Sequence, residues 1–422
     1  MPRPLRLLHT ADWHLGQTLH GLTREYEHSR FLDWLLDRIG EHAVDALIIA
    51  GDLFDGQNPP IPSLMLFHRF LASAKARFPR LDVVVLAGNH DSASRLDASA
   101  PLLAALGVAV IGAPPLRPDG RFDPAGLLVP LHDRDGLVAA RCVAMPHLRP
   151  ADLPALPIED GVEGVDPLIE GVRQLYDQAV TAARACLNAD EALVLTGHCY
   201  MRGGALSDLS ERKILGGNLH ALPVDIFPAD AAYVALGHLH RAQAVGGLEH
   251  VRYSGSPLPL ALDEESYPHQ VMLVELAEGR MVGRQALPVP RAVPIHRIPG
   301  GGRFAPPDAT LEALRALPLD ADAPRERWPF VEVSVALASP RPALREEVEA
   351  ALAGRPARLV KLAVRLTGDG AALADHAPAV ELSDLEPEDV FHRLYQRHHQ
   401  GEPPPDLMAA FQQVLMSVQE GA

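Results

Sequence analysis

The sequence predicts an α/β fold for residues 1–287, in which two sheets are flanked by helices. Three observations lead to this prediction. Short apolar runs of strand length recur along this part of the chain. Helix-like segments with apolar residues on one face separate the first three runs. Each run ends in a turn of polar residues, and the order of strand, helix and strand is typical of a parallel sheet.

The elements of this domain follow from their apolar patterns. Five runs are predicted as buried strands: Leu5–His9, Ala46–Ala50, Val83–Leu86, Ala192–Leu195 and Tyr233–Leu236. Two helices are predicted between the first three strands, at Tyr26–Ile39 and Leu64–Phe78. From about Val251 the pattern changes to short runs separated by turn residues. It predicts antiparallel strands that complete a second sheet, at Val251–Ser254, Val271–Leu276 and Met281–Leu287.

The remainder of the chain predicts two smaller parts. Pro288–Pro307 is rich in Pro, Gly and Arg, which predicts a linker. Two alternating runs around a helical stretch at Leu344–Leu352 then predict a small αβ domain over residues 308–368. Pro387–His399 and Asp406–Glu420 predict a pair of helices within residues 383–420, the second with a continuous apolar stripe.

Composition limits the class of protein. The 422 residues are enough for two or three domains. No apolar run reaches the ~18 residues of a membrane span and no signal-peptide core follows Met1, so we expect a soluble, cytoplasmic protein without a membrane partner. The 3 cysteines have no CxxC spacing, which argues against a disulfide framework or a zinc knuckle. A net charge of -16 argues against a broad basic surface for nucleic acid.

Metal-type side chains follow all five predicted strands. The carboxyl ends of strands in an open α/β sheet are where ligands bind, so we expect these turns to meet at one site. A glycine precedes each of the last four turns and lets the backbone approach what the side chains hold. The candidate ligands are Asp12, His14, Asp52, Asn89, His198, His238 and His240.

This donor set predicts a pair of divalent cations. Oxygen and imidazole donors without a thiolate suit Mn²⁺, Fe or Zn²⁺ better than Mg²⁺ alone. Seven ligands are too many for one ion, whereas a carboxylate shared by two ions would accommodate them. Such a pair supplies hydroxide near neutral pH and neutralises phosphoryl oxygens, so the expected reaction is hydrolysis of a phosphoester.

Three further residues are candidates for the catalytic machinery. His90 is a candidate to protonate the leaving alkoxide, with Asp91 as its carboxylate partner. Asp55 is a candidate to orient a water or a neighbouring histidine.

Two alternatives stay open on residues alone. Each motif by itself is usually a turn, and the ligand set does not specify what carries the phosphate, so a small phosphoester or a phosphoprotein is an alternative substrate. A scaffold that keeps the fold without the chemistry is disfavoured, because no ligand position is missing.

The motifs together resemble those of the calcineurin-like metallophosphoesterases. The resemblance rests on Asp12-x-His14, Gly51-Asp52-x-x-Asp55, Gly88-Asn89-His90-Asp91, Gly197-His198 and Gly237-His238-x-His240. Three longer stretches, His9–Gln17, Ala235–Gln243 and Glu249–Pro257, are similar to the nuclease subunits of bacterial complexes that contain an SMC-like ATPase. This resemblance extends over nearly the whole chain.

The resemblance implies a nuclease with two metal ions, usually Mn²⁺ with Mg²⁺ as the alternative. It would cleave DNA as an exo- and endonuclease at double-strand ends and hairpins, in DNA repair and recombination. One ion would be held by Asp12, His14, Asp52 and His240, and the other by Asp52, Asn89, His198 and His238. His90 matches the residue that assists the leaving group, whereas Asp55 stands where some relatives carry a histidine, so its role is not carried over.

The resemblance also implies partners. The small αβ domain matches a capping, DNA-recognition domain, and the helix pair matches the element that docks the coiled coil of the SMC-type ATPase. A homodimer within a heterotetramer is implied. An acidic nuclease subunit fits this assembly if metal ions neutralise the scissile phosphate and the ATPase supplies much of the surface that holds the duplex. We therefore expect weak, salt-sensitive DNA binding by this chain alone.

Overall fold

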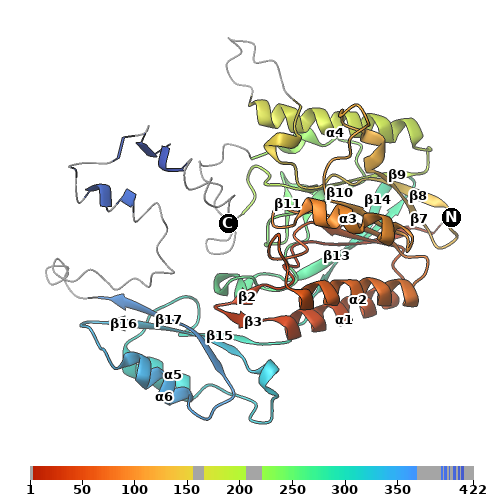
Figure 1. Cartoon of the computed structure of the whole chain (residues 1–422). Coiled ribbons are helices and arrows are strands. Elements are labelled where there is room, and N and C mark those ends of the chain that lie inside the picture. Colours follow the sequence, from red (N-terminus) through yellow and green to blue (C-terminus); the bar gives the residue numbers. More distant parts are fainter. Residues whose placement is uncertain are drawn as a thin grey trace. The chain divides into compact units, whose positions relative to one another are not determined.

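The structure is a computed structural model that describes residues 3–154, 166–205 and 221–367, together with residues 391–392, 394–396, 399, 403–404, 407–408 and 410–412 (Figure 1). The chain divides into two compact units. The first consists of residues 1–336 and 341–365, and the second of residues 337–340 and 366–422. The first unit contains the two large sheets that carry the predicted motifs.

The first large sheet has the strand order β14-β13-β1-β4-β5-β6. Its parallel strands are β1 (Leu5–Thr10), β4 (Ala46–Ala50), β5 (Asp82–Leu86) and β6 (Val108–Ile111). Two antiparallel strands extend it beyond β1, namely β13 (Gln270–Ala277) and β14 (Arg280–Pro288). All five residues of β4 are buried, as expected for a continuous apolar run in a sheet covered on both faces.

The second large sheet has the order β11-β12-β10-β9-β8-β7. Its parallel strands are β8 (Val138–Val143), β9 (Ala192–His198), β10 (Tyr233–Gly237) and β12 (Leu248–Tyr253). The edge strands β7 (Leu128–His132) and β11 (Gln243–Val245) are antiparallel to their neighbours.

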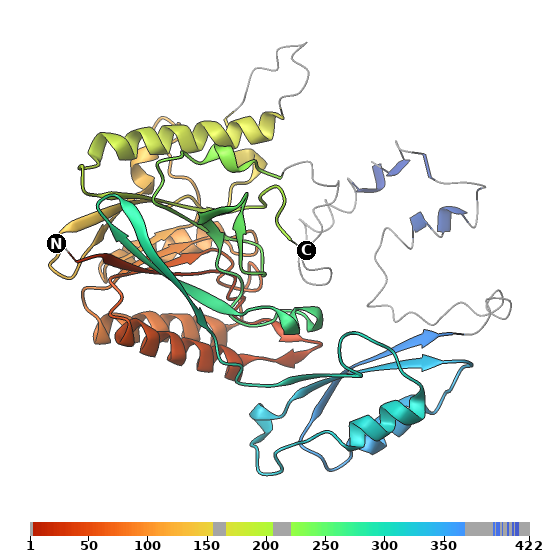
Figure 2. The ribbon, with the colours of Figure 1, turned by 180° about the vertical axis from the view of Figure 1, so that it is seen from behind.

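The two sheets face each other and helices cover their outer faces. A buried apolar cluster between the sheets joins residues of β1, β4 and β5 to residues of β8, β9 and β10. The outer face of the first sheet packs on α1 (Glu25–Glu41), α2 (Ile61–Arg77) and α3 (Ala93–Ala104). The second sheet packs on α4 (Pro167–Cys186). Figures 1 and 2 show α1 and α2 on one side of the sandwich and α4 on the other. The predicted two-sheet sandwich flanked by helices is confirmed.

The assignment of the later strands to a sheet was only partly right. All five predicted motif-bearing strands are present and start within one residue of the expected positions. Of the three later strands, only β12 joins the second sheet, and it runs parallel to β10. β13 and β14 extend the first sheet instead, antiparallel to β1. Alternating apolar residues identify a strand, but they do not identify its partner.

A three-stranded sheet, β15-β16-β17, forms the core of the small αβ domain. Its elements are β15 (Ile295–Ile298), α5 (Pro307–Arg315), β16 (Phe330–Leu337), α6 (Leu344–Leu352) and β17 (Arg358–Leu366). Because β15 pairs in parallel with β16, the prediction of a linker throughout Pro288–Pro307 is wrong over these four residues. The predicted bounds of the small αβ domain, residues 308–368, therefore leave out its first strand.

Most of the predicted helix pair at residues 383–420 lies outside the described residues. Of the described positions there, residues 391–392, 394–396, 407–408 and 410–412 are helical. The rings of Phe391 and Phe411 stack with their centroids 4.2 Å apart. None of the helices in the described part of the chain is both long and apolar enough to span a membrane.

Candidate metal centre

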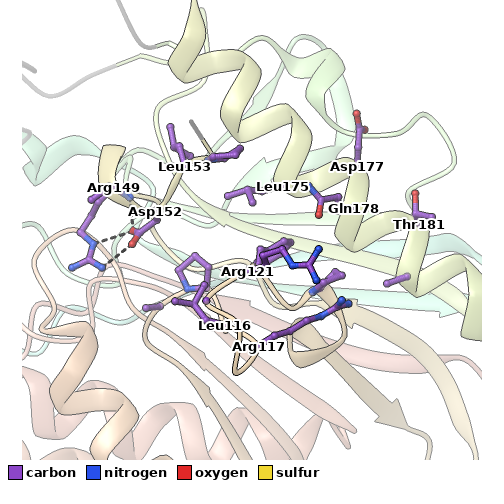
Figure 3. A pocket seen from close by; sticks show the side chains of 18 of the residues that line it. Leu116, Arg117, Arg121, Arg149, Asp152, Leu153, Leu175, Asp177, Gln178 and Thr181 are labelled. Carbon is purple, nitrogen blue, oxygen red and sulfur yellow. Dashed lines mark hydrogen bonds and ion pairs between the residues drawn. The ribbon is translucent and has the colours of Figure 1, made fainter. Parts of the chain in front are cut away.

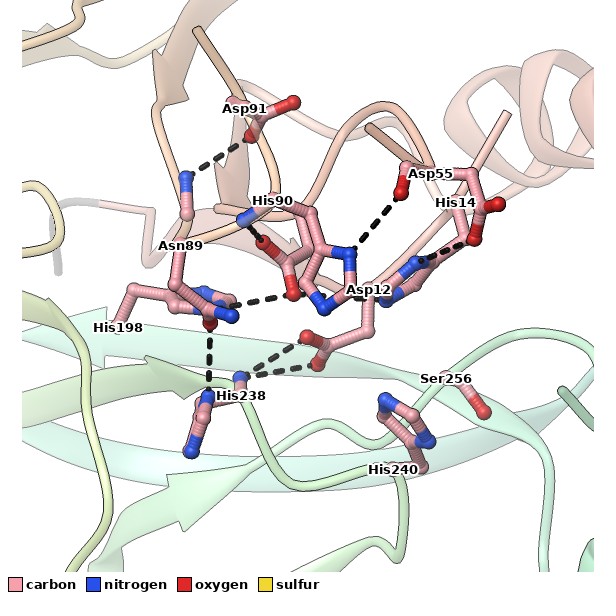
Figure 4. A network of polar contacts seen from close by, with 12 residues as sticks. Asp12, His14, Asp55, Asn89, His90, Asp91, His198, His238, His240 and Ser256 are labelled. Carbon is pink, nitrogen blue, oxygen red and sulfur yellow. Dashed lines mark hydrogen bonds and ion pairs between the residues drawn. The ribbon is translucent and has the colours of Figure 1, made fainter. Parts of the chain in front are cut away.

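Side chains from the five polar turns meet in one network of polar contacts (Figure 4). Three follow β1, β4 and β5 of the first sheet, and two come from the ends of β9 and β10 in the second. Backbone hydrogen bonds join the first two turns, because Asp12 N donates to Gly51 O at 3.0 Å and His14 N donates to Asp52 O at 3.0 Å. The parallel pairing of β1 and β4 therefore continues into the turns and fixes how their side chains face each other.

Glycine is required at two of these turns because other groups lie against the backbone. A Cβ at Gly51 would overlap the ring of His198, and the backbone there has φ +90°. A Cβ at Gly88 would overlap the carboxylate of Asp52. These overlaps explain why glycine precedes the polar residues of both motifs.

The backbone of four candidate ligands adopts positive φ angles. The values are 56° at Asp12, 45° at His14, 48° at Asp52 and 102° at His238. Non-glycine residues in this region are uncommon, and clusters of them are found at sites where the surrounding structure enforces a functional geometry.

Asp52 lies at the centre of the cluster. Its Oδ2 is 3.4 Å from Nε2 of His14 and 3.3 Å from Nε2 of His198, although these histidines come from different sheets. Its Oδ1 accepts a hydrogen bond of 2.8 Å from the backbone N–H of His90. One carboxylate oxygen thus lies between two imidazoles while the other is held by the backbone.

Asn89, His198 and His238 converge on one side of Asp52. Asn89 Oδ1 lies 3.0 Å from His198 Nε2 and 3.0 Å from His238 Nδ1. The Nδ1–H of His198 donates to the carbonyl oxygen of Ala50 at 2.9 Å, so Nε2 is the ring nitrogen that can hold a cation. Electron-pair donors gathered in this way are typical of a cation site.

Asp12, His14 and His240 form the other side of the cluster. Their candidate ligand atoms lie within 4.8 Å of one another, and the same holds for Asp12, Asp52 and His198. Both carboxylate oxygens of Asp12 face the backbone N–H of His238, at 2.9 and 3.2 Å. These contacts therefore bring the seven predicted ligands together in one cluster.

The residues present fit a centre of two divalent cations. Nε2 of His14 is buried and makes no hydrogen bond to any described residue, although Asp52 Oδ2 is nearby. Asp12, Asp52 and His198 are each at most 2% exposed, and such a concentration of buried ionisable groups requires compensation by charge. The donors are carboxylate, amide oxygen and imidazole, a set suited to Mn²⁺, Fe and Zn²⁺.

The pKa values of the buried groups report the same need for positive charge. Burial disfavours the charged form of His14, but the neighbouring carboxylates of Asp52 and Asp55 outweigh it and raise the pKa of His14 to about 10. Burial likewise opposes charge on His198, yet Asp52 raises the pKa of His198 to about 9. Burial lowers the pKa of His238 to about 3, and the charge of His198 adds to this shift. In the metal-free protein, protonated His14 and His198 therefore supply positive charge that bound cations would otherwise supply.

The candidate catalytic residues His90 and Asp55 lie beside this cluster. The ring of His90 is 4.8 Å from the ring of His14 between centroids, and its Nδ1–H donates to the carbonyl oxygen of Asp55 at 3.0 Å. The carboxylate Oδ1 of Asp55 lies 3.3 Å from His14 Nδ1. Asp55 thus contacts His14 through its carboxylate and His90 through its backbone carbonyl.

Asp91 is placed differently from the prediction. Its two oxygens accept hydrogen bonds from the backbone N–H groups of Leu53, Phe54 and Gly88, at 2.9 to 3.0 Å. The prediction that Asp91 is the carboxylate partner of His90 is therefore wrong, because Asp91 joins the turn after β4 to the turn after β5. Burial raises its pKa to about 6, and the nearby charge of Asp52 acts in the same direction.

Two residues near the site were missed by the sequence analysis. Glu264 is fully buried, and its Oε1 accepts a hydrogen bond of 2.8 Å from His240 Nδ1. His147 donates from Nδ1 to the carbonyl oxygen of His198 at 3.0 Å. Neither residue belongs to a glycine-led motif after a strand. Glu264 lies within the acidic run Asp263-Glu264-Glu265, which in sequence resembles a solvated turn.

A large cavity elsewhere in this unit is separate from the metal centre. It has a volume of about 1030 Å³ and lies between α4 and the chain segments around residues 113–124 and 149–154 (Figure 3). Arg117, Arg121 and Arg149 line it, and Arg149 is paired with Asp152 at 2.8 Å. None of the seven candidate ligands contributes to its lining.

Comparisons with known proteins agree with this geometry. Residues 5–242 match the family described as calcineurin-like phosphoesterase, and residues 291–399 match the type 5 capsule protein repressor C-terminal domain. The chain is 41% identical over 389 residues to the D subunit of nuclease SbcCD from Rhodobacter capsulatus, which covers 92% of this chain and 93% of that protein. It is 39% identical to the D subunit of the same nuclease from Escherichia coli K12, over 70% of this chain and 71% of that protein. For Bacillus subtilis the identity is 35%, over 65% and 67% respectively.

Proposed function

The chain belongs to the calcineurin-like phosphoesterases, in the family of the SbcCD nuclease D subunits, and from this premise we propose that it is the metal-dependent nuclease subunit of a DNA-processing complex. It hydrolyses phosphodiester bonds as an exo- and endonuclease at double-strand ends and hairpins, in DNA repair and recombination. The names of its relatives favour this function over hydrolysis of a small phosphoester or a phosphoprotein.

The observation that carries this proposal is the position of Asp52 Oδ2 between His14 and His198, at 3.4 and 3.3 Å from their Nε2 atoms. We assign Asp52 as the ligand that two cations would share. Asp12, His14 and His240 would complete one site, and Asn89, His198 and His238 would complete the other. The grouping of Asp12 with Asp52 and His198 supports two neighbouring sites rather than two separate ones.

The chemistry divides between the cations and the side chains beside them. When bound, the two cations supply a hydroxide nucleophile near neutral pH and neutralise the phosphoryl oxygens. His90 protonates the leaving alkoxide from Nε2, because its Nδ1–H is held by the carbonyl oxygen of Asp55. Asp55 also orients His14 through its carboxylate, and Asp91 positions the turns that carry Asp52 and His90.

We further propose Mn²⁺ as the working metal, with Mg²⁺ as the weaker alternative. Four of the seven assigned ligands are imidazoles, namely His14, His198, His238 and His240. Imidazole ligands count against Mg²⁺, which prefers oxygen and retains its waters, and the preference for Mn²⁺ over Fe or Zn²⁺ is carried over from the family resemblance.

The proposed partners are an SbcC-like SMC-type ATPase and a second copy of this chain, in a heterotetramer that works in the cytoplasm at the nucleoid. The helix pair of residues 383–420 is the proposed docking element for the ATPase. The ring stack of Phe391 on Phe411 supports a pairing of these two segments. The net charge of -16 supports a partner that holds much of the duplex.

The test uses the chain purified with its SMC-type ATPase partner on end-labelled duplex and hairpin DNA. We expect degradation in Mn²⁺, none in chelator, and a loss of at least about 100-fold in Asp52→Asn, because an amide cannot replace the shared carboxylate. Cleavage of small phosphoesters such as bis-p-nitrophenyl phosphate without any cleavage of DNA would overturn the proposed substrate.

A further inference from the structure

The side chain of Glu264 is buried against a candidate metal ligand. It lies in the short 3₁₀ turn of Leu262–Ser266 that follows β12 in the chain, and its side chain is 0% exposed. A carboxylate in such a place requires partners for both oxygens. Oε1 accepts from His240 Nδ1 at 2.8 Å, and Oε2 accepts from the backbone N–H of Leu260 at 2.6 Å.

We propose that Glu264 is a positioning residue that aims Nε2 of His240 at one of the two metal sites. This inference rests on the proposed function, since it concerns the ligand set of that centre. A carboxylate accepts hydrogen bonds, so the bond from His240 places the ring proton on Nδ1. The electron pair for a cation is then on Nε2, on the opposite edge of the ring from Glu264.

The turn that carries Glu264 and the residues just before it are held in place by the buried side chain of His269 and the partly buried side chain of Gln17. His269 donates from Nε2 to the carbonyl oxygen of Glu264 at 2.9 Å. Gln17 donates from its side-chain amide to the carbonyl oxygen of Leu260 at 2.8 Å, and Gln17 N is bonded to His14 O at 3.0 Å. The turn is thus anchored to the loop that supplies Asp12 and His14, the two ligands that group with His240.

A further contact extends this anchoring to α1. The guanidinium of Arg24, at the start of α1, donates to the side-chain oxygen of Gln17 at 2.8 Å and to the carbonyl oxygen of Pro259 at 2.6 Å. Glu27 pairs with the other side of this buried guanidinium, with Oε2 2.8 Å from Nε. The segment that carries Glu264 is therefore held by several hydrogen bonds and an ion pair. A residue that orients a metal ligand needs such fixed surroundings.

The substitution Glu264→Gln separates positioning from packing. Glutamine has nearly the same shape but only one acceptor oxygen, whereas His240 and Leu260 both donate to this side chain. If that oxygen remains with Leu260, the amide N–H₂ faces His240 and favours the tautomer with the proton on Nε2, the nitrogen meant for the metal. The volume of the side chain changes little, so the packing of the turn is preserved.

The test measures Mn²⁺ binding by isothermal titration calorimetry on the full chain. Glu265→Gln is the matched control, because it is the same change one position along at a side chain that is 38% exposed. We expect two Mn²⁺ ions per wild-type chain and the same in Glu265→Gln. In Glu264→Gln, we expect one of the two ions to bind 10- to 100-fold more weakly, as found when a partner of a ligating histidine is removed. If Glu264→Gln does not fold, Glu264→Asp carries the same expectation, because it withdraws the carboxylate from His240 by one methylene.

The possible outcomes separate the two proposals. Two wild-type ions with unchanged binding constants in Glu264→Gln overturn the role of Glu264 alone. The same holds if the melting temperature of the metal-free variant falls while both constants are retained, since this would show a purely structural role. Fewer than two ions in the wild type overturn the dimetal centre and the inference together. Two wild-type ions with no cleavage of DNA by the complex overturn the nuclease proposal while leaving Glu264 in place.

Discussion

The two carboxylate oxygens of Asp52 have different surroundings. Oδ1 is held by the backbone N–H of His90, and Oδ2 lies between two imidazoles from opposite sheets. Asp52 thus joins the candidate metal ligands to the turn that carries the proposed acid. Because the bond to Asp52 comes from the backbone of His90, a change of the His90 side chain should affect proton transfer without affecting the candidate ligands.

We expect His90→Ala to lower kcat on duplex DNA by about 10²- to 10⁴-fold, the usual range for a lost general acid. Binding of Mn²⁺ should be unchanged, because the backbone N–H that holds Asp52 remains. Kinetics of the complex and calorimetry of the chain measure the two quantities. His250→Ala is the control, since this histidine lies outside every candidate group. Loss of Mn²⁺ in His90→Ala would contradict the separation of the two roles.

Gly88→Ala should disrupt the centre through one methyl group. The new Cβ would overlap the Asp52 carboxylate, so either the carboxylate or the turn must move, at about 1 to 3 kcal/mol of folding stability. We expect weaker Mn²⁺ binding and a lower melting temperature. Gly300→Ala is the matched control, because the nearest atom to its added Cβ is 3.9 Å away. Equal Mn²⁺ affinities in the two variants would refute the steric argument.

At the level of residues, the meeting of the candidate ligands at one site could be predicted, whereas the residues that support them could not. The candidate ligands follow apolar strands and glycines, so their chemical type and position are visible in the sequence. The burial of Glu264 and its hydrogen bond to His240 are visible only in the folded structure. In the sequence, Glu264 lies between two other acidic residues and looks like part of an exposed turn. Asp91 was recognised as part of a motif, but its role was misread because its partners are backbone N–H groups from another turn.

Among the elements, the turns after β4 and β5 are joined by the Asp91 carboxylate. In the metal-free protein its pKa is raised to about 6, from about 3.9 in an unfolded chain. The folded state therefore binds this proton more tightly. The stability that the proton contributes is fully present below about pH 4 and is lost as the pH rises through about 6, by about 2 to 3 kcal/mol.

Asp91→Asn should remove this dependence, because asparagine does not titrate. We expect the free energy of unfolding of the metal-free wild type, relative to Asp91→Asn, to decrease by about 2 to 3 kcal/mol between pH 4 and pH 7. Urea unfolding in the presence of chelator measures this difference. Parallel curves for the two proteins would show that the proton on Asp91 is not linked to folding.

Strands could be predicted more reliably than their pairing. The continuous apolar run of Ala46–Ala50 is buried on both faces and so can hardly be mistaken. β13 and β14 belong to the first sheet because β13 pairs with β1. The alternation of apolar residues in the sequence does not indicate which strand is the partner. β15 was hidden because it has only four residues and lies within a segment rich in Pro, Gly and Arg.

For the molecule as a whole, bound metal should contribute to stability. Cations that bind only the folded state stabilise it by about 2.7 kcal/mol at a concentration 100 times Kd. We therefore expect chelation to lower the melting temperature by roughly 3 to 7 °C, as read by fluorescence of the 3 tryptophans. Asp52→Asn should show a smaller difference between its metal-loaded and metal-free forms. Identical melting temperatures for the wild type with and without Mn²⁺ would contradict a folded metal centre.

The charge of the chain leads to a prediction about DNA. With a net charge of -16, the isolated chain should bind duplex with a Kd of about 10⁻⁶ M or weaker at physiological salt, and more weakly as salt increases. Fluorescence anisotropy in chelator, where the duplex is not cut, measures both properties. Nanomolar binding by the isolated chain at physiological salt would show that it does not depend on a partner for the duplex.

The left-handed backbone at Asp12, His14, Asp52 and His238 restricts which sequences can replace this one. Asn, Asp and His tolerate this conformation far better than β-branched or bulky residues do. Substitution at these four positions is therefore restricted mainly to Asn, Asp, His and Gly, even under selection for another metal. Exchange of Asp52 for Glu, which keeps the charge, would meet a conformational obstacle that exchange for Asn would not. In laboratory evolution, variants of this centre should change their metal preference through the supporting residues before they change the ligands themselves.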